Sequence, residues 1–172
     1  AWEAALGLLR SMPSWRLAPN VVTYSAAISA FEKGKRWEGA LALLGEMRRL
    51  ALAPDIISYN ASISACAAAS QWGRALQVFG EVQQRPLNST VITYSAAIGA
   101  CDRGHLWEEA IGLLRELQEQ SHQPDFISYG TAISACARGQ RHDCALILLR
   151  HIEQRWGREA WLWIRGPHAA AG

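Results

Sequence analysis

The sequence has no long hydrophobic run and no strong excess of charge of either sign. No apolar stretch approaches the roughly 18 residues that a membrane-spanning helix needs. Its 17 basic and 15 acidic residues leave a formal net charge of +2. This mildly basic balance permits an acidic partner such as nucleic acid but does not require one. Half of the 172 residues are hydrophobic, which excludes a disordered chain.

The signatures of common catalytic and metal sites are missing as well. The sequence has no Cys-x-x-Cys and no His-Glu-x-x-His, which argues against a zinc site. It has no glycine-rich phosphate loop with a lysine and no pair of carboxylates that recurs on one face. The 5 histidines are scattered along the chain. We therefore expect no enzyme, no cofactor and no bound metal.

The sequence does not begin with methionine, and its opening, AWEAALGLLR, reads as a helix already under way. We therefore expect a fragment or a processed product, from which any targeting peptide has been lost.

What the sequence does have is one segment that occurs four times. VVTYSAAISA begins at residue 21, IISYNASISA at 56, VITYSAAIGA at 91 and FISYGTAISA at 126, so the spacing is 35 residues each time. A fixed period between 20 and 50 residues indicates stacked structural repeats. Residues 21–55 and 91–125 are identical at 17 of 35 positions without a gap.

The same register extends back to the start of the chain, because a tryptophan recurs at the same interval from Trp2 to Trp107. We expect the second half of a truncated repeat, three complete repeats, a degenerate capping repeat and a tail. Their respective ranges are 1–20, 21–55, 56–90, 91–125, 126–160 and 161–172.

Each unit has the pattern of two short helices. Tyr24, Ala27 and Ile28 lie on one face of the first, as the i, i+3, i+4 spacing predicts. The hydroxyl before each tyrosine is predicted to cap this helix, and a glycine to end it in a left-handed conformation. The second helix is predicted to begin near Trp37 and its equivalents. The capping hydroxyls belong to Thr23, Ser58, Thr93 and Ser128, and the glycines are Gly34, Gly104 and Gly139.

Such a helical hairpin cannot bury both apolar faces alone, but stacking on its neighbours does so. The sequence therefore predicts an all-α fold, a right-handed α-solenoid of helix-turn-helix repeats. Cys66, Cys101 and Cys136 occupy the place that Phe31 takes in the first copy, which is typical of an apolar packing site. Equivalent atoms of stacked units lie roughly 10 Å apart, too far for a disulfide.

The period of 35, the Val/Ile-Thr/Ser-Tyr opening, the Ala-Leu of the second helix and the Pro-Asp ending resemble the pentatricopeptide repeat (PPR) family. The resemblance covers residues 1 to 152. It implies binding of single-stranded RNA at one base per repeat, in an organelle, either chloroplast or mitochondrion, with a role in RNA maturation, stability or translation. A protein-binding scaffold without RNA specificity is the alternative, since α-solenoids present extended surfaces to partners.

In the family, the residue after the tyrosine and the last residue of the unit read the base. A carboxylate only accepts hydrogen bonds, which suits the N–H donors of guanine, and a short Ser leaves room for a purine. Asn60 is longer and suits a pyrimidine. With the N-terminus toward the 5′ end, as in the family, the expected sequence is 5′-G-Y-G-3′. The reading pairs are Ser25 with Asp55, Asn60 with Thr90, and Ser95 with Asp125.

Two further rows of equivalent residues have roles in the family. An apolar residue three positions before each reading residue sandwiches the base, although it could instead pack between repeats. These residues are Val22, Ile57, Ile92 and Ile127. A basic residue near the end of the first helix contacts phosphate, although it could instead offset the helix dipole. These residues are Lys33, Arg103 and Arg138; the second repeat has Ala68 there.

The fourth unit departs from the pattern. Its reading pair would be Gly130 and Ala160, neither of which can hydrogen-bond a base through its side chain. We expect residues 126–152 to cap the array without specifying a base. The tryptophans beyond, Trp156, Trp161 and Trp163, either cover the open end of the solenoid or leave it exposed.

Overall fold

The computed structural model describes residues 1–157, which contain helices and no strand. This confirms the predicted all-α solenoid. None of the helices in the described part combines the length and the apolar character needed to cross a membrane. The helices are α1 (Trp2–Ser11), η1 (Met12–Trp15), α2 (Val21–Lys33), α3 (Trp37–Arg49), α4 (Ile56–Ala68), α5 (Trp72–Gln83), α6 (Val91–Arg103), α7 (Trp107–Glu119), α8 (Phe126–Arg138) and α9 (His142–Trp156).

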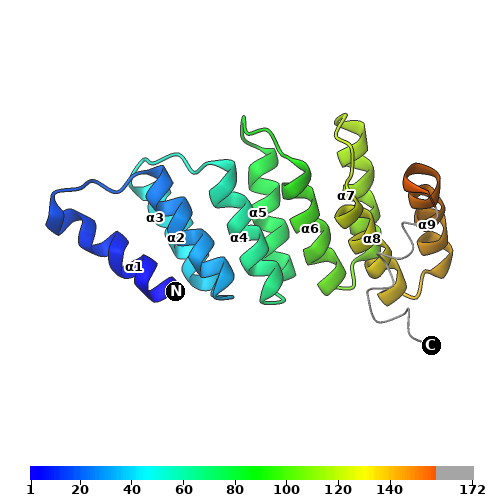
Figure 1. Ribbon diagram of the computed structural model, residues 1–172, viewed down its shortest axis with the longest axis horizontal. Helices are drawn as coiled ribbons and strands as arrows, with labels where there is room; N and C mark the ends of the chain where they lie inside the picture. The colour runs from blue at the N-terminus through cyan, green and yellow to red at the C-terminus, as the bar shows by residue number, and fades with distance from the viewer. Residues whose placement is uncertain (158–172) are drawn as a thin grey trace.

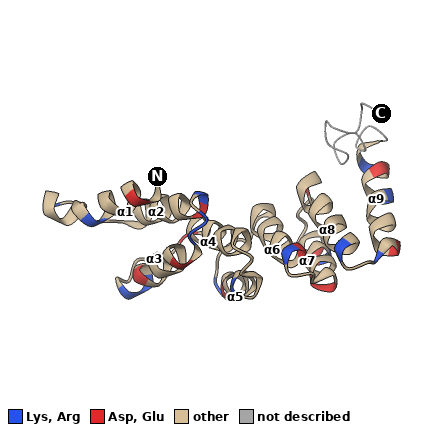
Figure 2. Ribbon diagram, turned by 90° about the horizontal axis from the view of Figure 1, so that it is seen from below, with Lys and Arg blue, Asp and Glu red and all other residues tan. Residues whose placement is uncertain are grey.

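The helices stand side by side in an elongated array (Figure 1). The first helices of successive units, α2, α4, α6 and α8, pack against one another in chain order. Each second helix packs on the first helix of its own unit, and α3, α5 and α7 also pack on that of the next. Seen from below, α3 and α5 lie on one side of α2 and α4 (Figure 2). The first helices therefore form a continuous layer with one face left uncovered by the second helices.

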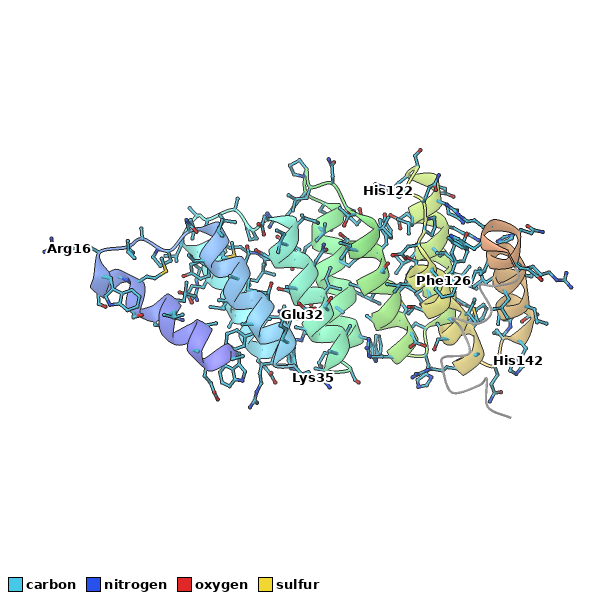
Figure 3. All side chains as sticks on the ribbon, viewed as in Figure 1. Arg16, Glu32, Lys35, His122, Phe126 and His142 are labelled. Atoms are coloured by element: carbon cyan, nitrogen blue, oxygen red, sulfur yellow. The ribbon has the colours of Figure 1, made fainter. Side chains whose placement is uncertain are left out.

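The two kinds of turn lie on opposite edges of the array. Lys35 and His142, at the joints between the two helices of a unit, lie along one edge, and His122, between two units, lies along the other (Figure 3). Every first helix starts at the edge marked by His122 and ends at the edge marked by Lys35 and His142. Equivalent residues of successive units therefore form rows along the array.

The buried face of each hairpin agrees with the predicted pattern. Tyr24, Ala27, Ile28 and Phe31 are at most 5% exposed. Cys66, Cys101 and Cys136 are also buried, with free thiols. Burial raises the pKa of the Cys66 and Cys136 thiols to about 11 and that of Cys101 to about 12. These thiols are therefore protonated packing residues at neutral pH.

The N-cap of each first helix lies three residues before the predicted capping residue. The N-cap residues are Asn20, Asp55, Thr90 and Asp125. Each accepts a hydrogen bond from the backbone N–H three residues on. The predicted caps occupy the third helical position, and Thr23 and Thr93 close a reciprocal capping box from there. The prediction therefore assigned the N-cap to the third helical residue, whereas the N-cap is the residue three positions earlier.

The glycines that end three first helices also differ from the prediction. Gly34 has a φ of −81° and Gly104 of −86°, both right-handed values. The left-handed residue is the next one, Lys35 or His105, with a φ of 54° or 58°. Glycine instead leaves space for a tryptophan of the preceding unit, which a Cβ would meet in its present position; the second copy has Ala69 here. The closest approaches would be 2.6 Å to Trp2 from Gly34, 2.8 Å to Trp72 from Gly104 and 2.5 Å to Trp107 from Gly139.

A second glycine accommodates Phe31, the ring that replaces cysteine in the first complete unit. Phe31 stacks on Trp2 with ring centroids 5.2 Å apart, and its other side lies against Gly39 of α3. A Cβ on Gly39 would lie 2.2 Å from Cε1 of the ring. The equivalent residues in later units are Arg74 and Glu109. Their own units have a cysteine at the position of the Phe31 ring. Phe31 and Gly39 therefore form a matched pair.

At the C-terminal end, Trp156 covers part of α8, the first helix of the fourth unit. Its ring lies 6.2 Å from the Phe126 ring and 5.6 Å from the Tyr129 ring, both edge-on, and Trp156 is 39% exposed. The other residues named for this end, Ala160, Trp161 and Trp163, lie outside the described residues.

Candidate nucleic-acid interface

The predicted base-reading residues lie at the edge where one unit passes to the next. Ser25 is in the second turn of α2, and Asp55 is the N-cap of α4. Because α2 and α4 pack side by side, residues 30 positions apart in the sequence meet here. The same arrangement recurs at each junction in the array.

The first pair, Ser25 and Asp55, is joined directly. Ser25 Oγ lies within hydrogen-bond distance of two acceptors, Asp55 Oδ1 at 3.0 Å and the Val21 carbonyl oxygen at 2.8 Å. The same Oδ1 accepts from Ser58, from its backbone N–H at 2.8 Å and from its hydroxyl at 2.7 Å. Burial raises the pKa of the Asp55 carboxyl, but the hydrogen bonds from Ser58 and Ser25 outweigh it and hold the pKa below its usual value. Asp55 is thus an ionised acceptor at neutral pH, with Oδ2 outside this set of bonds.

The third pair, Ser95 and Asp125, is joined through an intermediate. Ser95 Oγ lies 2.7 Å from Ser128 Oγ, which donates to Asp125 Oδ1 at 2.6 Å. The backbone N–H of Ser128 donates to the same oxygen at 2.8 Å. Ser128 therefore links the reading residue of one unit to the carboxylate at its end.

The middle pair is different, because Asn60 and Thr90 do not hydrogen-bond each other within the described structure. Thr90 is the N-cap of α6, and its hydroxyl lies 3.2 Å from that of Thr93. Asn60 Oδ1 is buried and has no hydrogen-bond partner. A buried acceptor without a donor costs about 1–3 kcal/mol.

The predicted sandwiching residues are among the most exposed apolar side chains of the described part. Val22 is 71% exposed, Ile57 57%, and Ile92 and Ile127 are each 67% exposed. These four residues, the apolar row, lie in the first turn of each first helix. They therefore stand on the open face of the layer, not in the contact between units.

The predicted phosphate-contacting residues, Lys33, Arg103 and Arg138, lie at the opposite end of the same helices. Each is eleven positions after a member of the apolar row, a spacing that returns to the same helix face. Arg103 donates to the Gly99 carbonyl at 3.1 Å. Arg138 Nε lies 3.3 Å from Asp102 Oδ1, without the alignment of a hydrogen bond. The basic row is exposed but partly neutralised at its third member.

Two residues of this interface, Ser58 and Ser128, were predicted only as caps. The sequence does contain a signal for them: serine stands at this position where the preceding unit ends in aspartate, and threonine where it does not. No group of three or more potential metal ligands occurs within the described residues.

The comparisons with known proteins agree on one family. A pentatricopeptide repeat domain model matches residues 42–103 and a PPR repeat model matches residues 22–51. No curated protein matches the sequence.

Among solved structures, the pentatricopeptide repeat protein PPR10 from maize is 25% identical, with a TM-score of 0.66 over 89% of this chain and 22% of that one. PPR10 in complex with an 18-nt psaJ RNA element is 26% identical, with a TM-score of 0.73 over 89% of this chain and 23% of that one. This chain thus spans less than a quarter of PPR10.

The PPR domain of Arabidopsis thaliana protein-only RNase P 1, in complex with tRNA, is 21% identical, with a TM-score of 0.67 over 74% of this chain and 67% of that one. At this identity the likeness shows the fold alone. The repeat models, the 35-residue period and the shared solenoid agree: residues 22–103 consist of pentatricopeptide repeats, in a chain with the same solenoid fold as PPR10.

Proposed function

We propose that this chain binds single-stranded RNA along the open face of its first-helix layer, one base at each junction between units. The observation that carries the proposal is the apolar row, a large exposed side chain beside each reading position in four successive units. Exposed apolar side chains repeated at this regularity need a partner. Base faces are suitable partners, because stacking against them tolerates any sequence.

The basic row favours RNA over a protein partner. An apolar row alone would serve a protein-binding scaffold equally well. Here, however, Lys33 and Arg103 share a helix face with the apolar residues and lie about 16 Å away along it, at 1.5 Å per residue. A strand of RNA laid along the array would meet apolar side chains with its bases and positive charge with its phosphates. Ala68 leaves a gap in the row at the second repeat.

The reading pairs favour the sequence 5′-G-Y-G-3′. Asp55 and Asp125 present carboxylate oxygens that only accept, which suits the N–H groups of guanine. At the middle position, the longer Asn60 side chain, whose amide can both donate and accept, suits a pyrimidine. The orientation of the RNA, and a role in organellar RNA maturation, stability or translation in chloroplast or mitochondrion, rest on the family resemblance. Three bases are too few to select one transcript, so we assign target choice to a longer array.

The proposal is tested by titrating fluorescently labelled 12-nucleotide RNAs that contain one G-U-G or G-C-G triplet. We expect binding to single strands and not to the matching duplex. We also expect the affinity to fall with salt at a log–log slope of about −2, since each phosphate contact on a single strand contributes about −0.7.

The Lys33→Ala variant tests the contribution of the basic row, and it should make the salt slope shallower by about 0.7. Equal affinity for duplex and single strand, or a slope near zero, would contradict the proposal and favour a scaffold.

A further inference from the structure

A second hydroxyl lies beside each serine–aspartate pair, and it comes from the unit that follows the reading serine. Ser58 Oγ is 2.7 Å from Asp55 Oδ1 and 2.8 Å from Ser25 Oγ. Ser128 Oγ is 2.6 Å from Asp125 Oδ1 and 2.7 Å from Ser95 Oγ. Both of these serines are 0% exposed, so no solvent competes for their hydroxyls.

The direction of these hydrogen bonds follows from the number of protons available. A serine hydroxyl has one proton, and a carboxylate can only accept. Since Ser128 gives its proton to Asp125, the bond between the two hydroxyls must be donated by Ser95. Ser95 Oγ then has only lone pairs left for a ligand. The same reasoning makes Ser25 an acceptor, because its proton is held by Ser58, Asp55 or the Val21 carbonyl.

Threonine at the same position behaves differently. Thr23 Oγ1 accepts from the backbone N–H of Asn20 at 2.9 Å, and Thr93 Oγ1 from that of Thr90 at 3.1 Å. These hydroxyls serve the helix terminus. Thr93 Oγ1 also lies 3.2 Å from Oγ1 of Thr90, but within the described structure it makes no hydrogen bond to Asn60, the residue after the tyrosine of the preceding unit. The link to the reading serine is thus confined to the two units that begin after an aspartate.

We propose that Ser58 and Ser128 are specificity-determining residues of the RNA site, which orient the aspartate and make the reading serine an acceptor. The inference rests on the proposed RNA binding. A pair that presents two acceptors matches guanine, whose Watson–Crick edge has adjacent N–H donors at N1 and N2. Adenine places an acceptor, N1, against the same pair. The serine of the following unit, Ser58 or Ser128, thereby strengthens the preference for guanine over adenine.

The effect should be larger at Ser128 than at Ser58. Within the described structure Ser128 is the one hydrogen-bond partner of the Ser95 side chain. Removing it frees the Ser95 proton for a base acceptor such as adenine N1. Ser25 would still hold its proton on Val21 O or Asp55 Oδ1, at 2.8 Å and 3.0 Å.

The test is equilibrium binding of the whole chain to RNAs that differ at one base of the G-Y-G triplet. For Ser128→Ala we expect discrimination of guanine over adenine at the third base to fall about tenfold, the effect of one hydrogen bond in a charged network. Discrimination at the first two bases should stay unchanged. Ser58→Ala should lower discrimination at the first base by about threefold and repeats the test in a second unit.

Ser62→Ala is the matched control. Its hydroxyl is also buried, in the same helix as Ser58, and donates to the Ser58 carbonyl at 2.8 Å without touching a reading residue. Thermal melts establish that each variant is folded, and Ser62→Ala should leave all discrimination unchanged.

The possible failures are distinguishable. If wild type prefers guanine and both serine variants keep that preference in full, the two serines only cap helices and the inference is overturned while RNA binding stands. If wild type binds no RNA, or binds all bases at the third position equally, the proposed function or its base reading fails, and the inference fails with it.

Discussion

Replacing Ile57 and Ile92 together by alanine is expected to weaken single-stranded RNA binding by about a hundredfold and leave protein stability almost unchanged. The two side chains are 57% and 67% exposed, so their removal opens no cavity, and exposed substitutions usually change stability by less than about 0.5 kcal/mol. Burying an isoleucine side chain against a base contributes about 1.5–3 kcal/mol at most, which corresponds to about tenfold or more for each residue. Fluorescence titration and urea unfolding measure the two quantities.

Leu146→Ala provides the control for this experiment. Leu146 is 57% exposed on α9, a second helix, and so lies outside the apolar row. It should leave RNA affinity unchanged. A loss of more than about 1 kcal/mol of stability in the double variant, with RNA affinity intact, would instead mean that the row packs between repeats.

Adding one methyl group at Gly39 is expected to destabilise the first complete unit by about 1–3 kcal/mol, the usual cost of overpacking. Alanine would ordinarily stabilise a helix relative to glycine by about 1 kcal/mol, so the sign of the effect is diagnostic. The cause is the Phe31 ring, which lies 2.2 Å from the position of the new Cβ. Urea unfolding and amide hydrogen exchange in α2 and α3 measure the change.

The double variant Phe31→Cys/Gly39→Ala tests that cause. Phe31→Cys alone should cost about 3 kcal/mol or more, because Phe31 is 5% exposed and its loss leaves a cavity. Combined with Gly39→Ala it should cost less than the sum, with a coupling of about 0.5–3 kcal/mol. Strictly additive effects would show that the ring and the glycine are not a matched pair.

The sequence predicted the fold because its main determinant is periodic. A 35-residue repeat with an apolar face in each helix leaves stacking as the way to bury Tyr24 and Ile28, and both are buried. The helix termini were less accessible. The side-chain oxygen of the N-cap Asn20 and the hydroxyl of Thr23 each accept a backbone N–H in one capping box, so the sequence pattern alone does not tell which of the two is the N-cap.

Other features depend on contacts between units, which local pattern does not contain. Gly104 resembles a left-handed cap in the sequence, but its contact is the Trp72 ring, 32 residues earlier, against which a Cβ would lie at 2.8 Å. Ser128 is a hydroxyl residue at the start of a helix, as a capping residue would be. Its hydroxyl, however, also contacts Ser95, 33 residues earlier. For the reading residues, the sequence and the family resemblance predict the pairs. The structure adds which pairs are connected by hydrogen bonds and through which hydroxyl.

The most direct test of the account is selection from a random RNA pool by wild type and by the double variant Asn60→Ser/Thr90→Asp. This variant gives the middle position the residues of its two neighbours. The account predicts enrichment of G-Y-G by wild type and of G-G-G by the variant, with the outer bases unchanged. If neither protein enriches a triplet at low salt, or if the middle base does not change with the residues, the pairs at the unit junctions do not read RNA.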